Sequence, residues 1–92
     1  MDLNRWPHLK LLVEVARSLP PLQLWLFGSA LRCEHPADLD VLLVYQDHST
    51  VMALRRMNRW EDMCPPFHLI AMTPREIDEY DFIRRTGAVR LM

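Results

Sequence analysis

The sequence has no apolar run near the roughly 20 residues that a membrane-spanning helix requires. It has little net charge either, because its 11 basic and 12 acidic residues leave a balance of −1. A chain without an excess of one sign has no long-range field to attract nucleic acid or an anionic membrane. Its first residues also lack the basic and then apolar order of a secretory signal peptide. We therefore expect no membrane association and no direct binding to nucleic acid.

Cysteine and glycine are scarce as well, with two of each in 92 residues. Cys33 and Cys64 are too few for a disulfide framework, which favours a reducing compartment, so we expect the protein in the cytoplasm. With His35 and His68 they form a minor alternative, a zinc site, although their spacing is not the Cys-x₂₋₄-Cys pairing of such sites. Cys64 also fits the apolar side of a helix as a buried structural thiol.

The remaining composition is that of one small globular domain, residues 1–92. Half of the residues are apolar, and a chain of this length forms a single domain. The apolar periodicity alternates between helical and strand patterns. It predicts, in order, a helix over 3–19, a strand over 23–27, a helical turn over 30–33, a strand over 38–45, a helix over 49–63, a strand within 65–72, a helix over 73–87 and an edge strand within 88–92. This order predicts an α+β (or α/β) fold with helices packed on a small mixed sheet.

Two of the predicted helices carry more detailed signals. In the helix over 49–63, four residues are spaced to form the buried side: Ala53, Met57, Trp60 and Cys64. In the helix over 73–87, Thr73 and Glu76 predict a capping box and Pro74 suits the first turn. Arg84, Arg85 and Gly87 are expected to close that helix.

Asp38 and Asp40 open the most apolar strand. Alternate residues of a strand point to the same side, so these carboxylates share one face while Leu39 and Val41 share the other. Carboxylates held side by side repel each other unless a cation lies between them, and such an oxygen-rich pair suits Mg²⁺ or Mn²⁺. The plainer interpretation is that Asp38 starts the strand and Asp40 faces solvent.

Gly28 and Ser29 directly follow the first strand. Glycine permits a positive φ and a close approach of the backbone, and N–H groups between a strand and a helical turn can point at an anion. The Ser29 hydroxyl adds a further donor. Phosphates beside a divalent metal indicate nucleoside triphosphate chemistry. Taken alone, a Gly-Ser pair is more often an ordinary turn.

The whole segment, FGSALR…ADLDVLLV, resembles the signature of the DNA polymerase β-type nucleotidyltransferase superfamily, and within it the minimal nucleotidyltransferases. That pattern is an apolar strand, Gly-Ser, a short helix that often carries Arg, and Asp-x-Asp at the start of an apolar strand. The order of elements over the whole chain also resembles the family, which implies a nucleotidyltransferase-like fold. The matching residues are Phe27, Gly28, Ser29, Arg32, Asp38, Leu39, Asp40 and Val41.

The resemblance implies that Gly28, Ser29 and Arg32 bind the triphosphate and that Asp38 and Asp40 hold Mg²⁺ or Mn²⁺. The implied activity is transfer of a nucleoside monophosphate, AMP from ATP in the first place, to a hydroxyl acceptor. Members of the family often act as antitoxins that pair with a helical HEPN-type toxin and modify it with AMP. The resemblance therefore also implies a partner protein of this kind.

Two departures from the family pattern bear on catalysis. The spacer between Ser29 and Asp38 has eight residues, which is shorter than in the usual pattern. His68 stands where a later strand normally supplies a third carboxylate. An imidazole suits transition metals better than Mg²⁺, or it can act as a general base. We take Asp38, Asp40 and His68 as the candidate catalytic residues. The alternatives are a non-catalytic module that binds a protein partner and a sensor that binds nucleotide without turnover.

Overall fold

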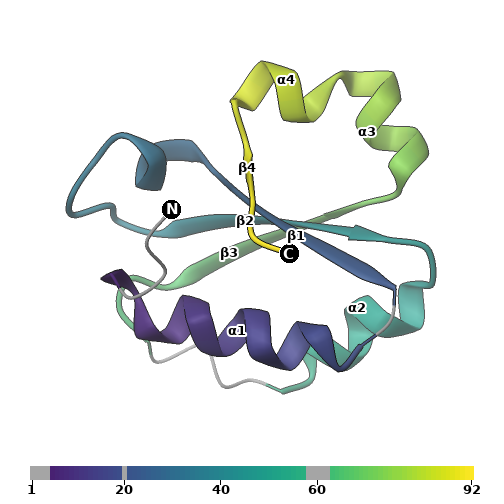
Figure 1. The fold of residues 1–92 in the computed structure, drawn as a ribbon, viewed down its shortest axis with the longest axis horizontal. Helices are drawn as coiled ribbons and strands as arrows, with labels where there is room; N and C mark the ends of the chain where they lie inside the picture. Colours follow the sequence, from purple (N-terminus) through teal and green to yellow (C-terminus); the bar gives the residue numbers. More distant parts are fainter. Residues whose placement is uncertain (1–4, 20, 58–62) are drawn as a thin grey trace.

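The computed structural model describes residues 5–19, 21–57 and 63–92, and four strands in these ranges form one mixed sheet (Figure 1). At its centre, β1 (Leu22–Phe27) pairs antiparallel with β2 (Leu39–Tyr45). β3 (Phe67–Met72) lies parallel to β2, and the short β4 (Val89–Arg90) lies antiparallel to β1. The order across the sheet is β3-β2-β1-β4. The expected strands, including the edge strand near the C-terminus, are therefore confirmed.

Helices cover both faces of this sheet (Figure 1). On one face lie α1 (Pro7–Arg17) and α2 (His48–Arg55), and on the other α3 (Pro74–Tyr80) and α4 (Phe82–Thr86). A single turn of 3₁₀ helix, η2 (Gly28–Leu31), leads from β1 toward β2. The expected α+β architecture, helices packed on a small mixed sheet, is confirmed. None of the helices in the described ranges has the length and apolar character needed to cross a membrane.

The larger core lies between the sheet and the pair α1 and α2. Alternate residues of β1 and β2 point into it, as the period of two in a strand requires. Each buried leucine contributes about 1.5–3 kcal/mol relative to an exposed one, so this layer dominates the stability of the fold. Its buried members on these four elements are Leu9, Leu12, Val13, Ala16, Leu22, Leu24, Leu26, Leu39, Val41, Leu43, Val51 and Leu54.

The opposite face of the sheet is covered less completely. Only Leu42 and Val44 of β2 and Ile77 of α3 are buried there among the described residues. The other apolar side chains on this face keep part of their surface exposed; they are Trp25, Phe27, Ile70, Met72, Phe82 and Ile83. Asp40 and His68 belong to the same face, because they are two residues before Leu42 and Ile70 on their strands.

The boundaries of α2 differ from the expectation. The helix was expected over 49–63, but it ends at Arg55 and residues 56–57 form a turn. Residues 58–62 lie outside the described residues, and with them the expected core residue Trp60. At its start, Asp47 caps the helix by accepting a hydrogen bond from the Ser49 backbone N–H (2.9 Å). This bond stabilises the charged carboxylate and lowers the pKa of Asp47.

The expected buried side of α2 was also largely wrong, although Met57, in the turn after the helix, packs partly buried against the core. Thr50, Val51 and Leu54 are the residues that face the core, whereas Ala53 is only half-buried and Cys64 is exposed in a bend beyond the helix. The spacing of the three buried residues, i, i+1 and i+4, also satisfies a helical period. Periodicity alone did not decide which of the two faces would meet the sheet.

The helix expected over 73–87 is two helices. Asp81 adopts a left-handed conformation (φ 51°) and separates α3 from α4, because that conformation cannot continue a right-handed helix. Its carboxylate accepts a hydrogen bond from Nε of Arg84 (2.7 Å). Gly87, with φ 66°, ends α4 as expected.

The capping box of α3 is confirmed in full. The Thr73 hydroxyl oxygen accepts a hydrogen bond from the Glu76 backbone N–H (3.2 Å), and the Glu76 carboxylate accepts one from the Thr73 backbone N–H (3.0 Å). Such reciprocal bonds satisfy N–H groups that the first turn of a helix leaves free. The first turn of α3 is therefore specified by residues 73–76 themselves.

We expect Thr73→Ala to lower the free energy of unfolding by about 1 kcal/mol, because it removes the side-chain cap. Urea denaturation followed by circular dichroism measures this. Arg75→Ala is the control, since Arg75 is exposed in the same turn and its loss leaves both capping bonds intact. Equal stability of Thr73→Ala and Arg75→Ala would contradict the role of the cap.

Candidate functional site

The pairing of β1 with β2 brings the Gly-Ser turn against the Asp-x-Asp segment. Phe27 lies opposite Asp40 in the antiparallel register, so Gly28, the next residue, sits beside that carboxylate. Gly28 has φ 80°, a conformation that favours glycine. A Cβ built on it would overlap Oδ2 of Asp40 and lie 3.1 Å from its Cγ. A side chain at this position is therefore opposed both by the backbone conformation and by the Asp40 carboxylate.

Asp40 also contacts His68 on the neighbouring strand β3. Asp40 and His68 are partners in the parallel register of β2 and β3, and Nδ1 of His68 lies 3.0 Å from Oδ1 of Asp40. The Asp40 side chain is 19% exposed and that of His68 is 62% exposed. The carboxylate is thus held within the sheet, while the imidazole remains open to solvent.

Asp38 is not part of the group that Gly28, Asp40 and His68 form. It is half-buried in the segment just before β2, and no hydrogen bond or ion pair involves its side chain among the described residues. Within these residues, no group of three or more His, Cys, Asp or Glu side chains is arranged to hold a metal ion. The structure thus brings Gly28, Asp40 and His68 together, whereas Asp38 does not join them in a ready three-ligand cluster.

Ser29 and Arg32 frame the turn that follows Gly28. The Ser29 carbonyl oxygen accepts hydrogen bonds from the backbone N–H groups of Arg32 (3.0 Å) and Cys33 (2.9 Å), which closes the turn. Arg5 donates from Nη2 to the Cys33 carbonyl (3.0 Å) and ties the end of this turn to the N-terminal segment. Ser29 and Arg32 are exposed, and neither side chain has a hydrogen-bond partner among the described residues. Both remain available to a ligand.

The carboxylates of this site can be compared with the ligands that a divalent metal requires. Mg²⁺ is commonly held by one or two carboxylates, with substrate phosphates and water as its other ligands. Asp38 and Asp40 can supply the two carboxylates, so the donor set fits Mg²⁺ or Mn²⁺ when a phosphate shares the metal. The zinc alternative gains no support, because Cys33 and Cys64 are both exposed and neither joins a group of three candidate ligands within the described ranges.

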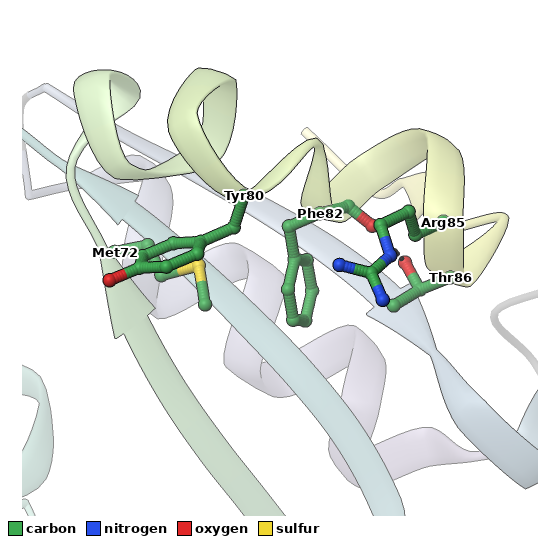
Figure 2. Close-up of a pocket in the computed structure, with 5 residues that line it drawn as sticks. All are labelled: Met72, Tyr80, Phe82, Arg85 and Thr86. Atoms are coloured by element: carbon green, nitrogen blue, oxygen red, sulfur yellow. Dashed lines mark hydrogen bonds between the residues drawn. The ribbon is translucent and has the colours of Figure 1, made fainter.

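A pocket on the same face of the sheet was not predicted from the sequence. It lies between the end of β3 and the α3–α4 pair (Figure 2). The one available signal was a pair of aromatic residues, Tyr80 and Phe82, in a segment otherwise rich in charge. Its lining residues are Met72, Tyr80, Phe82, Arg85 and Thr86.

Comparison with known proteins gives no match to a family model, to a curated protein or to a solved structure. Within the chain itself, Asp40 contacts both Gly28 and His68 and so connects the three residues.

We expect Gly28→Ala to destabilise the protein more than Gly87→Ala. Both glycines have positive φ, which costs an alanine about 1 kcal/mol, but a Cβ on Gly87 has no neighbour within 4 Å whereas one on Gly28 meets Asp40. Urea denaturation of the two variants isolates the Asp40 contact. Asp40→Ala in the Gly28→Ala background should recover part of the loss, which a double-mutant cycle measures as a coupling energy. Equal losses at the two glycines, or zero coupling, would contradict the contact.

Proposed function

We propose that this chain binds a nucleoside triphosphate with Mg²⁺ or Mn²⁺ at the corner formed by Gly28, Ser29 and Asp40, and transfers its nucleoside monophosphate to a hydroxyl acceptor. The observation that carries the proposal is the packing of a positive-φ glycine against a half-buried carboxylate on the neighbouring strand. A triphosphate with its metal needs donors for phosphate oxygens and carboxylates for the cation at one place. This corner offers the Ser29 hydroxyl as a donor and Asp40 as a carboxylate, and Asp38 is two residues before Asp40 in the chain.

The residues divide these tasks by their chemistry. The Ser29 hydroxyl and the Arg32 guanidinium are donors without protein partners in the described ranges, and they would bind phosphate oxygens. Asp38 and Asp40 would hold the divalent cation. When bound, this cation supplies neutralisation of charge on the leaving group and activation of the attacking hydroxyl. ATP is the nucleotide favoured by the resemblance.

The proposed reaction is an in-line displacement at the α-phosphorus. The acceptor hydroxyl oxygen forms a bond to this phosphorus, the bond from phosphorus to the bridging oxygen breaks, and pyrophosphate leaves with the electron pair. The hydroxyl proton passes to a base. If Nδ1 of His68 donates its proton to Asp40, as the 3.0 Å contact permits, Nε2 carries the lone pair and can accept that proton.

The contact between Asp40 and His68 also favours a second candidate, nucleotide binding without transfer. A neutral imidazole in place of a carboxylate leaves the site with one negative charge fewer, and hard Mg²⁺ prefers oxygen to nitrogen. It also occupies one oxygen of Asp40 with a hydrogen bond. In this case the protein would sense nucleotide, or respond to it while bound to a partner.

Location and partner complete the proposal. Cys33 and Cys64 are exposed free thiols, which supports the cytoplasm as the compartment, since exposed thiols persist where the environment is reducing. The resemblance supports a helical HEPN-type protein as the partner, and an acceptor hydroxyl on that partner is the form of the reaction that we propose.

We expect Asp40→Asn to weaken binding of ATP in the presence of Mg²⁺ or Mn²⁺ at least about tenfold, or about 1.4 kcal/mol. The neutral amide removes the charge that holds the metal. Isothermal titration calorimetry measures the affinity. Glu14→Gln is the matched control, because Glu14 is an exposed carboxylate on α1, which covers the opposite face. Unchanged affinity in Asp40→Asn would refute the proposed role of this carboxylate.

We expect His68→Asp to tighten Mg²⁺ binding and to raise transfer, because it restores a third carboxylate beside Asp40. Transfer is measured with ATP labelled at the α-phosphate and the candidate partner as acceptor, at a fixed Mg²⁺ concentration. His68→Asn removes the imidazole without adding charge. It therefore separates the effect of losing the imidazole from the effect of gaining a carboxylate. If the wild type transfers efficiently and both variants lose that activity, the expectation fails and His68 is the base.

A further inference from the structure

The pocket between β3 and the α3–α4 pair has the volume of a small-molecule site. Its volume is about 470 Å³, within the range of roughly 300–1,000 Å³ that is usual for ligand pockets. Figure 2 shows Phe82 pointing from α4 toward the sheet, between Tyr80 and Arg85. Tyr80 is 54% exposed, so much of its surface remains available for contact.

The lining of this pocket suits a planar aromatic ligand. Tyr80 and Phe82 present ring surfaces, and Met72 adds a polarisable thioether that packs well against rings. Arg85 contributes a planar guanidinium, which stacks on aromatic rings and donates to ring nitrogens and carbonyl oxygens. No hydrogen bond or ion pair within the described residues engages that guanidinium, whereas the neighbouring Arg84 is paired with Asp81.

The pocket adjoins the phosphate corner through one pair of aromatic rings. The ring centroids of Phe82 and Phe27 are 5.1 Å apart in an edge-to-face arrangement. Phe27 lies opposite Asp40 and directly precedes Gly28. Side chains directly opposite on neighbouring strands are about 5 Å apart at Cβ. Phe27 therefore lies between Asp40 and the side of the pocket that Phe82 forms.

We infer that this pocket receives the purine base of the nucleoside triphosphate whose phosphates bind at Gly28 and Ser29, an inference that rests on the proposed function. A nucleoside triphosphate joins a planar ring to a polyanion, and the two neighbouring sites match these two parts. A purine rather than a pyrimidine is indicated because the larger ring system covers more of the two aromatic side chains. Tyr80 and Arg85 then determine affinity for the base, and Gly28 and Ser29 determine affinity for the phosphates.

The test uses two probes that each report on one part of the site. Adenosine has the base without phosphates, and inorganic tripolyphosphate has the phosphates without a base. Both are titrated by NMR into the full chain in the presence of Mg²⁺. Tyr80→Ala should weaken adenosine binding at least about fivefold, the lower end of the effect of base stacking on an aromatic side chain, and leave tripolyphosphate binding unchanged. Tyr80→Phe, which keeps the ring, should bind adenosine as the wild type does.

A second pair of variants supplies a matched control on α4. Arg85→Ala should weaken adenosine binding, whereas Arg84→Ala should not, because Arg84 does not line the pocket. Circular dichroism verifies that each variant is folded. Ser29→Ala should show the converse pattern, with weaker tripolyphosphate binding and unchanged adenosine binding.

The outcomes separate this inference from the proposed function. If wild-type protein does not bind adenosine, or if Tyr80→Ala binds it equally well, the inference is overturned while tripolyphosphate binding still supports the phosphate corner. If adenosine binds in a manner that depends on Tyr80 but tripolyphosphate does not bind, the pocket is a purine site and the proposed transfer fails. ATP that binds no more tightly than tripolyphosphate also overturns the inference.

Discussion

The antiparallel pairing of β1 with β2 is the interaction on which the rest of this structure depends. Its register places Phe27 opposite Asp40 and so brings Gly28 to the carboxylate. A slip of one residue would turn every side chain of a strand to the other face. The leucines of β1 would then leave the core, at a cost of about 1.5–3 kcal/mol for each one exposed. The geometry of the candidate site is therefore maintained by apolar burial on the opposite face of the sheet.

The two faces of the sheet have different roles because a small domain cannot bury both completely. A chain of this size buries only about 60–65% of the surface that its unfolded form exposes. The face under α1 and α2 contains most of the fully buried side chains among the described residues. The face under α3 and α4 is covered by two short helices and keeps partly exposed aromatic rings and the partly exposed Met72 thioether. That open face also presents Asp40 and His68, so the less buried layer is the one available for ligands.

Local signals in the sequence were sufficient where the responsible residues lie within a few positions of one another. The capping box between Thr73 and Glu76 and the short apolar strand β1 are of this kind. The buried face of α2 could not be predicted from such local signals. Its residues satisfy a helical period on two overlapping faces, and contact with the sheet selects one of them. The break at Asp81 was also missed, because aspartate tolerates a left-handed conformation without requiring it, unlike the glycine that ends α4.

The sequence by itself determined the α+β class, the strands and the identity of the candidate residues. Apolar patterns, helix caps and a short motif each depend on residues within a few positions of one another. Only the tertiary structure decided which of those residues meet. Register across three strands joined Gly28, Asp40 and His68 but did not draw Asp38 into the same cluster. The pocket beside them required the turn at Asp81 and the packing of Phe82 on Phe27. The strand pairings and the contact between Phe82 and Phe27 join residues that are far apart along the chain, and they exist only when the sheet and its helices have assembled.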